Sequence, residues 1–316
     1  MNGKIKYRIR NWSQYNKSLV QRGSINIWLS EDAIEKWTAL HSKHKQGRPY
    51  IYSDDAILTA LIIRSVFNLP LRSLQGFLLS IMSLMKLDLP IPSYSQISRR
   101  SQTLGKKLSR ISRKRVTDIV IDSTGLKVFG EGEWKVRQHG YSKRRTWKKL
   151  HLAVCPMSSE IICEVLTPNY VADSTVFDQL IDDMPNSVDT SYGDGAYDKE
   201  SCYHKSYKRG IKHIAPPQKN AVFRQNDMEW MDNRNNAIRE IVGLGNDSEA
   251  RRLWKILIGY HKRSIAETAM FRFKQLFGGN LRSRRYDTQQ SEARAKCIAL
   301  NKMTSLGMPK GKWCYC

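Results

Sequence analysis

Four residues near the end of the sequence have types and spacing suited to handling a polyanion and a cation together. Tyr260, Arg263, Glu267 and Lys274 follow the pattern Tyr-x2-Arg-x3-Glu-x6-Lys. With about 3.6 residues per turn, this spacing predicts that all four project from one face of a single helix. Glu267 would hold a metal cation there, while the bases hold a nucleic-acid backbone. Taken alone, the segment also fits a solvated helix with ordinary i,i+4 ion pairs.

A second acid, Asp122, comes at the end of a β-branched run. Residues 116–122 read Val-Thr-Asp-Ile-Val-Ile-Asp, which is typical of a buried strand, and the Ser-Thr-Gly that follows is typical of a strand end. Burying a carboxylate without a partner is unfavourable in free energy, so a purely structural role for Asp122 is not expected. Residues 126–129 predict a returning strand, which would place Asp122 near a hairpin.

A third acid, Asp194, stands between Gly193 and Gly195, directly before a predicted helix. Flanking glycines allow a ligand to approach the backbone closely. The structural alternative is a tight turn in which Asp198 is the N-cap of the next helix.

Together, Asp122, Asp194 and Glu267 supply three hard oxygen ligands without Cys or His partners, which favours magnesium or manganese over zinc. Two such ions about 3.5 to 4 Å apart can activate a nucleophile and stabilise the leaving oxygen of a phosphodiester. The acids lie in separate segments, so only a folded domain can bring them together. The predicted chemistry is in-line phosphoryl transfer on DNA with two Mg²⁺ or Mn²⁺ ions.

These segments resemble the DDE transposases of bacterial insertion sequences, and within them the insertion-sequence-five group. The Tyr-Arg-Glu-Lys pattern around Glu267 is the most specific part of the likeness. Residues 121–125 and 192–197 resemble the segments that carry the first and second catalytic acids. The likeness covers most of the chain and includes residues 144–154, 215–221 and 300–309.

The resemblance implies that the three acids named above are the catalytic metal ligands. It also implies that three signature residues lie near DNA: Tyr260, Arg263 and Lys274. Members of this family act on the terminal inverted repeats of their own element, and an oligomer pairs two element ends. The resemblance therefore implies DNA as the partner and a homo-oligomer as the acting form.

Composition supports a nucleic-acid partner. The sequence has 53 Lys and Arg against 29 Asp and Glu, a formal net charge of +24. Such a charge gives a large, salt-dependent affinity for DNA. No glycine-rich phosphate loop is present, so ATP is not expected. The most apolar run, residues 56–63, is too short to cross a bilayer, and we expect a cytoplasmic protein. The resemblance implies a bacterial protein associated with the nucleoid.

The sequence pattern changes from helical to strand-rich near residue 112, which predicts a helical DNA-binding domain at 1–112. Helices are expected at residues 30–37, 53–67, 71–79 and 93–104. The last is short, basic and preceded by a proline turn, as in a helix-turn-helix reader. Three of its residues could face base edges: Gln96, Arg99 and Arg100. A solvated helix of an ordinary bundle is the alternative.

Residues 113–308 predict an α/β, RNase H-like catalytic domain with a mixed five-stranded sheet and flanking helices. The expected order is four strands, then helix, strand, helix and strand, with a hairpin formed by residues 150–154 and 160–166. A short insertion is expected around 217–249, followed by a helix that runs through Lys274, and residues 309–316 form a tail. Four basic residues on a turn beside the site contact DNA or form a solvated edge: Arg144, Arg145, Lys148 and Lys149.

The sequence thus predicts a metal-dependent DNA transposase that binds terminal inverted repeats and catalyses strand cleavage and strand transfer. Two alternatives remain open. One is a decayed or domesticated DNA-binding protein that no longer cleaves. The other is a non-mobile nuclease with an RNase H-like fold.

Overall fold

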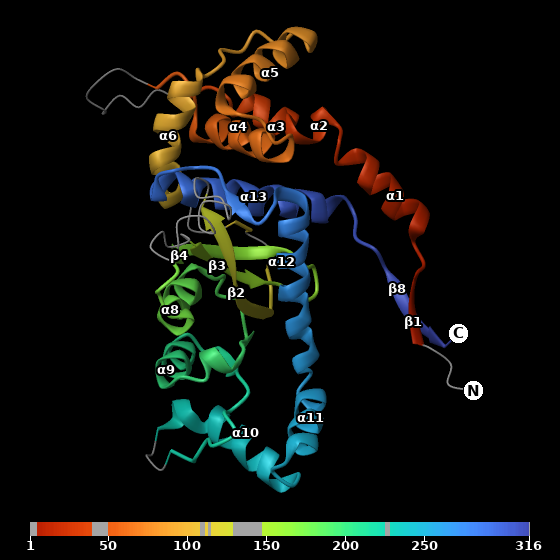
Figure 1. Ribbon diagram of the computed structural model, residues 1–316, viewed down its shortest axis with the longest axis vertical. Coiled ribbons are helices and arrows are strands. Elements are labelled where there is room, and N and C mark those ends of the chain that lie inside the picture. The colour runs from red at the N-terminus through yellow and green to blue at the C-terminus, as the bar shows by residue number, and fades with distance from the viewer. Residues whose placement is uncertain are drawn as a thin grey trace, which may run out of the picture. The chain divides into compact units, whose positions relative to one another are not determined.

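A computed structural model describes residues 5–39, 50–107, 111–112, 115–128, 147–224 and 228–315. Contacts divide the chain into two compact units (Figure 1). The first combines Met1–Leu104 with Ile298–Cys316, and the second is Gly105–Cys297. This division differs from the boundaries expected from the sequence, which assigned residues up to 308 to the catalytic domain. The C-terminal segment instead groups with the N-terminal residues.

The first unit is mainly helical, as predicted. Its helices are α1 (Trp12–Gln21), α2 (Ile25–Trp28), α3 (Glu31–Glu35), α4 (Asp54–Val66), α5 (Leu71–Leu84) and α6 (Tyr94–Lys107). The hydroxyl of Ser53 accepts a hydrogen bond from the backbone N–H of Ala56 at 2.9 Å, which makes Ser53 the N-cap of α4. Ile57 of α4 and Leu74 and Leu78 of α5 are fully buried and form part of the core of this unit.

A two-stranded ribbon joins the two ends of the chain in the first unit. Strand β1 (Ile5–Ile9) pairs antiparallel with β8 (Gly311–Tyr315). The residues expected to form a C-terminal tail are therefore largely a strand. The pairing requires a strand from the opposite end of the chain, and no local pattern in either segment indicates its partner.

The second unit is built on a mixed sheet with strand order β4-β3-β2-β5-β6. Its strands are β2 (Asp118–Val128), β3 (Trp147–Val154), β4 (Ile161–Pro168), β5 (Thr190–Tyr192) and β6 (Lys212–Ile214). The first three form an antiparallel meander, and β5 and β6 are added in parallel beside β2. The order of a three-strand meander followed by alternating helices and strands confirms the predicted RNase H-like α/β architecture.

The hairpin predicted after Asp122 does not form, because β2 continues through the Ser-Thr-Gly segment to Val128. Strand β3 pairs with β2 along this whole stretch, including Gly125 opposite Lys149. A short strand, β7 (Asn280–Leu281), pairs with the last residues of β2 on its other side. These two partners satisfy the backbone of β2 and outweigh the local turn preference of the segment. Asp122 consequently lies in the middle of a strand.

Helices cover both faces of this sheet (Figure 1). Helices α8 (Asp173–Asp183) and α9 (Glu200–Lys208) and the 3-10 helix η1 (Gly195–Tyr197) contribute to the core cluster on one face. Ile119 and Ile121 of β2 belong to this cluster together with Phe177 of α8. Helix α12 (Ser264–Phe277) packs against β2 and β3.

Helix α13 (Tyr286–Leu306) is attached to the sheet by a buried ion pair and carries a second buried pair within the helix. Arg294 Nε lies 2.6 Å from Oε1 of Glu164 on β4, and both side chains are almost fully buried. Glu292 pairs with Lys296 at 2.8 Å and also accepts hydrogen bonds from the backbone N–H groups of Arg282 and Ser283.

The helix predicted to run through Tyr260 to Lys274 is broken into separate pieces. The insertion after β6 contains η2 (Glu229–Met231), α10 (Asp232–Gly243) and α11 (Ser248–Leu257), so it is larger than the expected loop and helix. Gly259 then has a φ of 66°, in the left-handed region that favours glycine and ends an α-helix. The 3-10 turn η3 (Tyr260–Arg263) follows, and α12 begins only at Ser264.

Candidate active site

The guanidinium group of Arg263 joins two of the three predicted catalytic acids. Its Nη1 donates to Oδ2 of Asp122 at 3.0 Å, and its Nη2 donates to Oε1 of Glu267 at 2.6 Å. Asp122 lies on β2, whereas Glu267 lies in the first turn of α12. Because α12 packs against β2, two acids that are far apart in the sequence reach the same cation.

The third acid, Asp194, directly follows the segment that β5 places beside β2. Strand β5 runs parallel to the first residues of β2, and Gly193 and Asp194 come after its last residue. The Asp194 carboxylate accepts a hydrogen bond from the N–H of Ala196 at 2.9 Å and begins η1. Burial has the largest effect on the pKa values of Asp122 and Arg263, raising the first and lowering the second, and the negative charge of Asp194 raises both. The predicted triad therefore shares one electrostatic environment.

Tyr260 reaches this environment from η3 and not from a common helix face. Its side chain is mostly buried, and its hydroxyl donates to the carbonyl oxygen of Gly193 at 3.0 Å. Gly193 immediately precedes Asp194, so this bond attaches the segment after β5 to η3. The expectation of a single helical face is wrong, yet Tyr260, Arg263 and Glu267 still converge because η3 leads directly into α12.

Burial disfavours the charged form of the Asp122 carboxylate more than the neighbouring Arg263 favours it. Burial raises its pKa above the ordinary value for an Asp, and the charge of Asp194 raises it further. The N–H of Ser123, which donates to Asp122 at 2.8 Å, and the charge of Arg263 act in the opposite direction. Arg263 is the only described cation hydrogen-bonded to Asp122 or Glu267, so one positive charge faces two carboxylates, which would attract a further cation.

The buried hydroxyl of Tyr197 is a second indication that the site accepts another group. This oxygen has no hydrogen-bond partner within the described ranges. Burial raises its pKa, and the charges of Asp173, Asp122 and Asp194 raise it further. A buried hydroxyl without a partner is unfavourable, and an additional polar group beside these acids would relieve that cost.

The donor set fits a hard divalent cation in chemical type. Three carboxylates without a sulfur or imidazole ligand are the ligands of Mg²⁺ or Mn²⁺. As the described side chains stand, however, no three acidic, His or Cys groups converge closely enough to hold an ion. The guanidinium of Arg263 bonds to two of the three acids in this arrangement.

A fourth acid beside the site, Asp173, was not predicted as a functional residue. Its carboxylate accepts hydrogen bonds from Oγ of Ser123 at 2.8 Å and from Nζ of Lys149 at 2.9 Å. Lys149 also donates to the carbonyl of Val171 at 2.9 Å. Lys149, predicted to contact DNA, is thus engaged within the protein. No local sequence signal marks Asp173 as functional, because its hydrogen bond with Ser123 joins two distant segments and forms only in the folded domain.

The other predicted DNA contacts of this unit have different surroundings. The Nζ of Lys148 lies 5.1 Å from the ring centroid of Tyr286. Lys274 is exposed near the end of α12, two helical turns beyond Glu267, and no described hydrogen bond links it to the acids. Arg144 and Arg145 lie outside the described residues.

In the described part of the first unit, two of the three predicted base-reading residues are bonded within the protein. Gln96 accepts hydrogen bonds from the N–H and hydroxyl of Ser93, so it caps the start of α6. Arg100 pairs with Asp54 at 2.5 Å, donates to the carbonyl of Tyr52 and lies 4.2 Å from the ring centroid of Tyr50.

Arg99, by contrast, is exposed on α6. It lines a concave surface of about 530 Å³ together with Thr103 and the segment around Tyr50 and Ile51. Tyr50 is 55% exposed, so this surface offers both a guanidinium and an aromatic ring to solvent.

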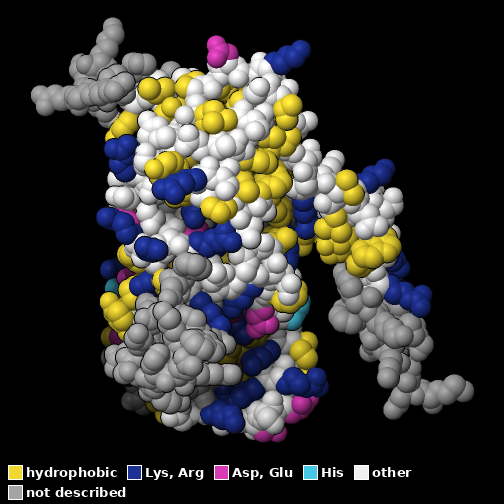
Figure 2. Space-filling view, turned by 45° about the horizontal axis from the view of Figure 1, so that its top comes forward, with side chains coloured by type: hydrophobic (Ala, Val, Ile, Leu, Met, Phe, Trp, Pro, Cys, Tyr) yellow, Lys and Arg dark blue, Asp and Glu magenta, His cyan; other side chains and the backbone are white. Residues whose placement is uncertain are grey.

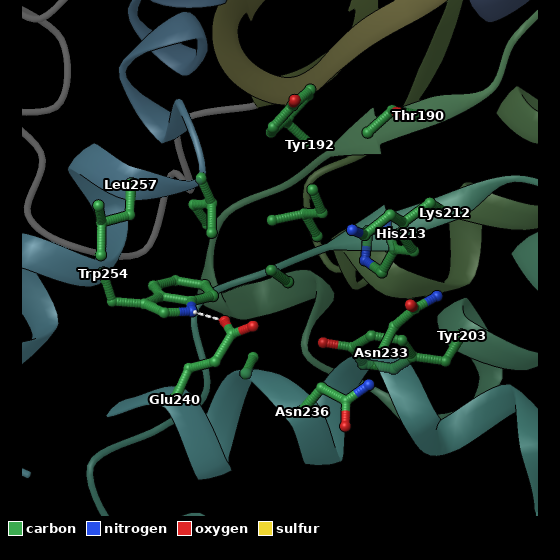
Figure 3. A pocket seen from close by; sticks show the side chains of 14 residues that line it. Thr190, Tyr192, Tyr203, Lys212, His213, Asn233, Asn236, Glu240, Trp254 and Leu257 are labelled. Carbon is green, nitrogen blue, oxygen red and sulfur yellow. Dashed lines mark hydrogen bonds between the residues drawn. The ribbon is translucent and has the colours of Figure 1, made fainter. Parts of the chain in front are cut away.

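A separate cavity of about 390 Å³ lies between the β6 edge of the sheet and the inserted helices α10 and α11 (Figure 3). Trp254 donates to Oε2 of Glu240 at 2.8 Å on one side of it. None of the three acids lines this cavity. This cavity is therefore separate from the three predicted acids.

Basic side chains outnumber acidic ones on the face drawn in Figure 2, as the net charge of +24 leads one to expect. None of the described helices is by itself long and apolar enough to cross a membrane. Helices α4 and α5 reach that length and composition only as a pair, which is bent by 107°.

Comparison with known proteins shows the family to which the chain belongs. Two family models, both described as "Transposase DDE domain", match the chain at residues 20–131 and 114–302. Among solved structures, the chain is similar to one titled "Cryo-EM structure of piggyBac transposase synaptic complex with hairpin DNA". The two chains are 7% identical with a TM-score of 0.40, and the match covers 94% of this chain and 76% of that chain. That similarity is too low to carry an argument, but the second family match spans more than half of the sequence and all three acids. The chain belongs to the transposase DDE domain family.

Proposed function

We propose that the protein is a transposase of a bacterial insertion element of the insertion-sequence-five group. It binds the terminal inverted repeats of its element and catalyses metal-dependent cleavage and strand transfer of DNA. The observation that carries this proposal is the bonding of Arg263 to both Asp122 and Glu267, with the charge of Asp194 also acting on it. Two of the three acids bond to this one guanidinium and the third acts on it through its charge, and carboxylate oxygens are the ligand type that hard divalent ions prefer.

Asp122, Asp194 and Glu267 would hold two Mg²⁺ or Mn²⁺ ions. Such ions, when bound, activate an attacking hydroxyl and stabilise the leaving oxygen of a phosphodiester. The protein's own groups orient the acids for this purpose. The N–H of Ser123 fixes one oxygen of Asp122, and the hydroxyl of Tyr260 holds the backbone next to Asp194.

The reaction consists of two displacements at phosphorus. In the first, water attacks the phosphodiester at the element end, the bond to the 3′ oxygen breaks, and a free 3′ hydroxyl results. In the second, this hydroxyl attacks a target phosphodiester, so that one phosphodiester bond forms as another breaks. Strand transfer is therefore nearly neutral in energy, and it does not require ATP or a covalent enzyme intermediate.

DNA contacts would come from both units. Among the cationic residues predicted to contact DNA, Arg99 in the first unit and Lys274 and Lys148 in the second form no ion pair with a described residue. Arg144 and Arg145 remain part of this proposal. Joining both element ends to one target requires two sites, so the acting form is a homo-oligomer that pairs the two ends.

The test is Mg²⁺-dependent cleavage of a labelled duplex that carries the terminal inverted repeat from the flanks of the coding sequence. Wild type is compared with Glu267→Gln, which keeps the size of the side chain and removes its charge. Glu249→Gln is the matched control, because Glu249 forms a similar exposed pair with Arg252 on α11, three residues away. We expect wild type and Glu249→Gln to cut at the repeat end, while Glu267→Gln binds the duplex without cutting.

The alternatives give different results. Binding to the repeat without cleavage by wild type would identify a decayed or domesticated DNA-binding protein. Cleavage without preference for the repeat end would identify a non-mobile nuclease. Cleavage that persists in Glu267→Gln would remove Glu267 from the mechanism.

A further inference from the structure

Arg263 forms hydrogen bonds to both Asp122 and Glu267, so one oxygen of each carboxylate already faces a positive charge. One terminal nitrogen of the guanidinium donates to Asp122 and the other donates to Glu267. Among the described residues, Arg263 is the only cationic side chain hydrogen-bonded to either acid. A planar guanidinium with two forked donors matches two carboxylates well.

The same geometry opposes the binding of a divalent ion. An ion that uses Asp122 and Glu267 as ligands takes the lone pairs that Arg263 now uses, and it brings two like charges close to the guanidinium. Like charges at short range repel strongly where the surroundings are partly buried. Arg263 must therefore move before the acids can close around an ion.

The two bonds of Arg263 differ in how readily they break. The Asp122 side chain is 15% exposed, whereas the Glu267 side chain is 58% exposed. An exposed ion pair contributes little stability because water and salt compete with it, while a buried pair is held more firmly. Release therefore begins at Glu267, at the open side of the site.

We propose that Arg263 occupies the place of the catalytic cations in the free protein and transfers to a DNA phosphate when DNA binds, so that DNA creates the metal site. This inference rests on the proposed function. A phosphate offers the guanidinium the same forked acceptor geometry as a carboxylate. The transfer frees both carboxylates at the moment when a phosphodiester enters the site. Arg263 thereby acts as a positioning residue that couples DNA binding to metal binding.

Coupling of this kind is reciprocal. If DNA raises the affinity for the ion by some factor, the ion raises the affinity for DNA by the same factor. Typical coupling of binding sites corresponds to about 5-fold to 150-fold. We expect about tenfold or more here, because the ion and the guanidinium compete for the same oxygen atoms.

The experiment measures Mn²⁺ binding to the full chain by the electron paramagnetic resonance signal of free Mn²⁺. Each protein is titrated alone and with a duplex that ends at the cleaved repeat terminus, so that no hydrolysis occurs. Wild type is compared with Arg263→Gln and with Lys262→Gln. Lys262 is the matched control, because it neighbours Arg263 on η3 but pairs with Asp118 at 2.6 Å and not with the three acids.

We expect wild type and Lys262→Gln to bind Mn²⁺ weakly alone and about tenfold or more tightly with DNA. Arg263→Gln should bind Mn²⁺ tightly without DNA, so that adding DNA increases its affinity much less. This variant separates the proposal from simple ligation of the ion by the DNA phosphate. Phosphate ligation alone would give Arg263→Gln the same enhancement as wild type, and that result would overturn the inference.

Two further outcomes are also decisive. Tight Mn²⁺ binding by wild type in the absence of DNA would overturn the coupling, while Glu267-dependent cleavage would still stand. An absence of Mn²⁺ binding with DNA in every protein would overturn the proposed function as well. Should Arg263→Gln not fold, Arg263→Lys serves instead. A lysine keeps the charge but lacks the fork, and we expect it to bind Mn²⁺ alone more tightly than wild type does.

Discussion

The hydroxyl of Tyr260 donates to the carbonyl oxygen of Gly193 at 3.0 Å, which connects η3 to the residue that precedes Asp194. This bond connects the turn that carries Arg263 to the segment that carries Asp194. The bond is buried, so water cannot replace it easily.

Tyr260→Phe removes this hydroxyl and leaves the Gly193 carbonyl without its side-chain partner. We expect a loss of about 1–3 kcal/mol in the free energy of unfolding, and a fall in Mg²⁺-dependent cleavage because Asp194 is less well positioned. The control is Tyr286→Phe, whose hydroxyl also donates to a carbonyl in the same unit, that of Leu166. Equal effects of both variants on cleavage, measured beside urea unfolding, would contradict a positioning role for Tyr260.

Gly193→Ala should be harmful, whereas Gly195→Ala should be tolerated. A Cβ at Gly193 would lie 2.9 Å from Cβ of Tyr197, while the nearest atom to a Cβ at Gly195 is 3.7 Å away. Because Tyr197 is fully buried beside the acids, it cannot move freely. We expect Gly193→Ala to cost about 1–3 kcal/mol of stability and to reduce cleavage. Thermal unfolding and cleavage assays on the two variants check this difference, and comparable behaviour of both would refute it.

The buried pair between Glu164 and Arg294 should matter more for stability than an exposed pair does. Arg294→Met leaves the Glu164 carboxylate buried without its partner, and we expect a loss of about 3–5 kcal/mol in the free energy of unfolding. The double variant with Glu164→Leu should recover much of this loss, because it removes both charges. Arg285→Met, which breaks an exposed pair with Asp287, should leave urea unfolding unchanged. No recovery in the double variant would argue against an electrostatic origin.

His213 predicts a specific dependence of stability on pH. Burial lowers its pKa from 6.5 to about 4, and its ring nitrogens lie 2.9 Å from Oγ of Ser191 and 3.2 Å from the carbonyl of Tyr197. Because the unfolded chain binds the proton more readily, this contribution is present above pH 6.5 and is lost as the pH falls from 6.5 towards 4. The full loss is on the order of 3 kcal/mol.

Unfolding free energies measured between pH 7 and pH 4 check this sign and size. His213→Gln should flatten the slope, whereas His204→Gln, which changes an exposed histidine on α9, should not. An unchanged slope in His213→Gln would place the titration elsewhere.

Substitution of Arg99 should weaken DNA binding, whereas substitution of Arg100 should lower stability. Arg99→Gln removes an exposed guanidinium, and we expect the affinity for the terminal repeat to weaken by about 1–3 kcal/mol with unfolding unchanged. Arg100→Gln breaks the pair with Asp54 and the bond to Tyr52, so it should lower the stability of the first unit by about 1 kcal/mol. Binding titrations at several salt concentrations and urea unfolding distinguish the two, and a stronger binding defect in Arg100→Gln than in Arg99→Gln would reverse the assignment.

Several elements could be predicted from the sequence because their signals are local. Ser53 caps α4 through its own hydroxyl, and the hairpin of β3 and β4 follows from two apolar runs around a turn. The three acids could be chosen because their residue types and neighbours differ from those of an ordinary surface. The RNase H-like order of elements followed from these local patterns.

Other features required the tertiary structure. The Ser-Thr-Gly segment after Asp122 has a local turn preference, but its backbone pairs with β3 along its length and with β7 at its end, and these partners are distant in sequence. The break at Gly259 did have a local signal, because a glycine stands there between two helical runs. The spacing of Tyr260, Arg263 and Glu267 nevertheless fits one helix face, and this favoured a continuous helix.

The sequence by itself determined which chemistry is available, because the acids, the bases and their surroundings are properties of residue type. Only the tertiary structure decided that Arg263 bonds to Asp122 and Glu267, that Asp173 binds Lys149, and that Gln96 and Arg100 serve the fold. The physical reason is that hydrogen bonds and ion pairs depend on distances of about 3 Å between groups, and the packing of helices on a sheet sets those distances.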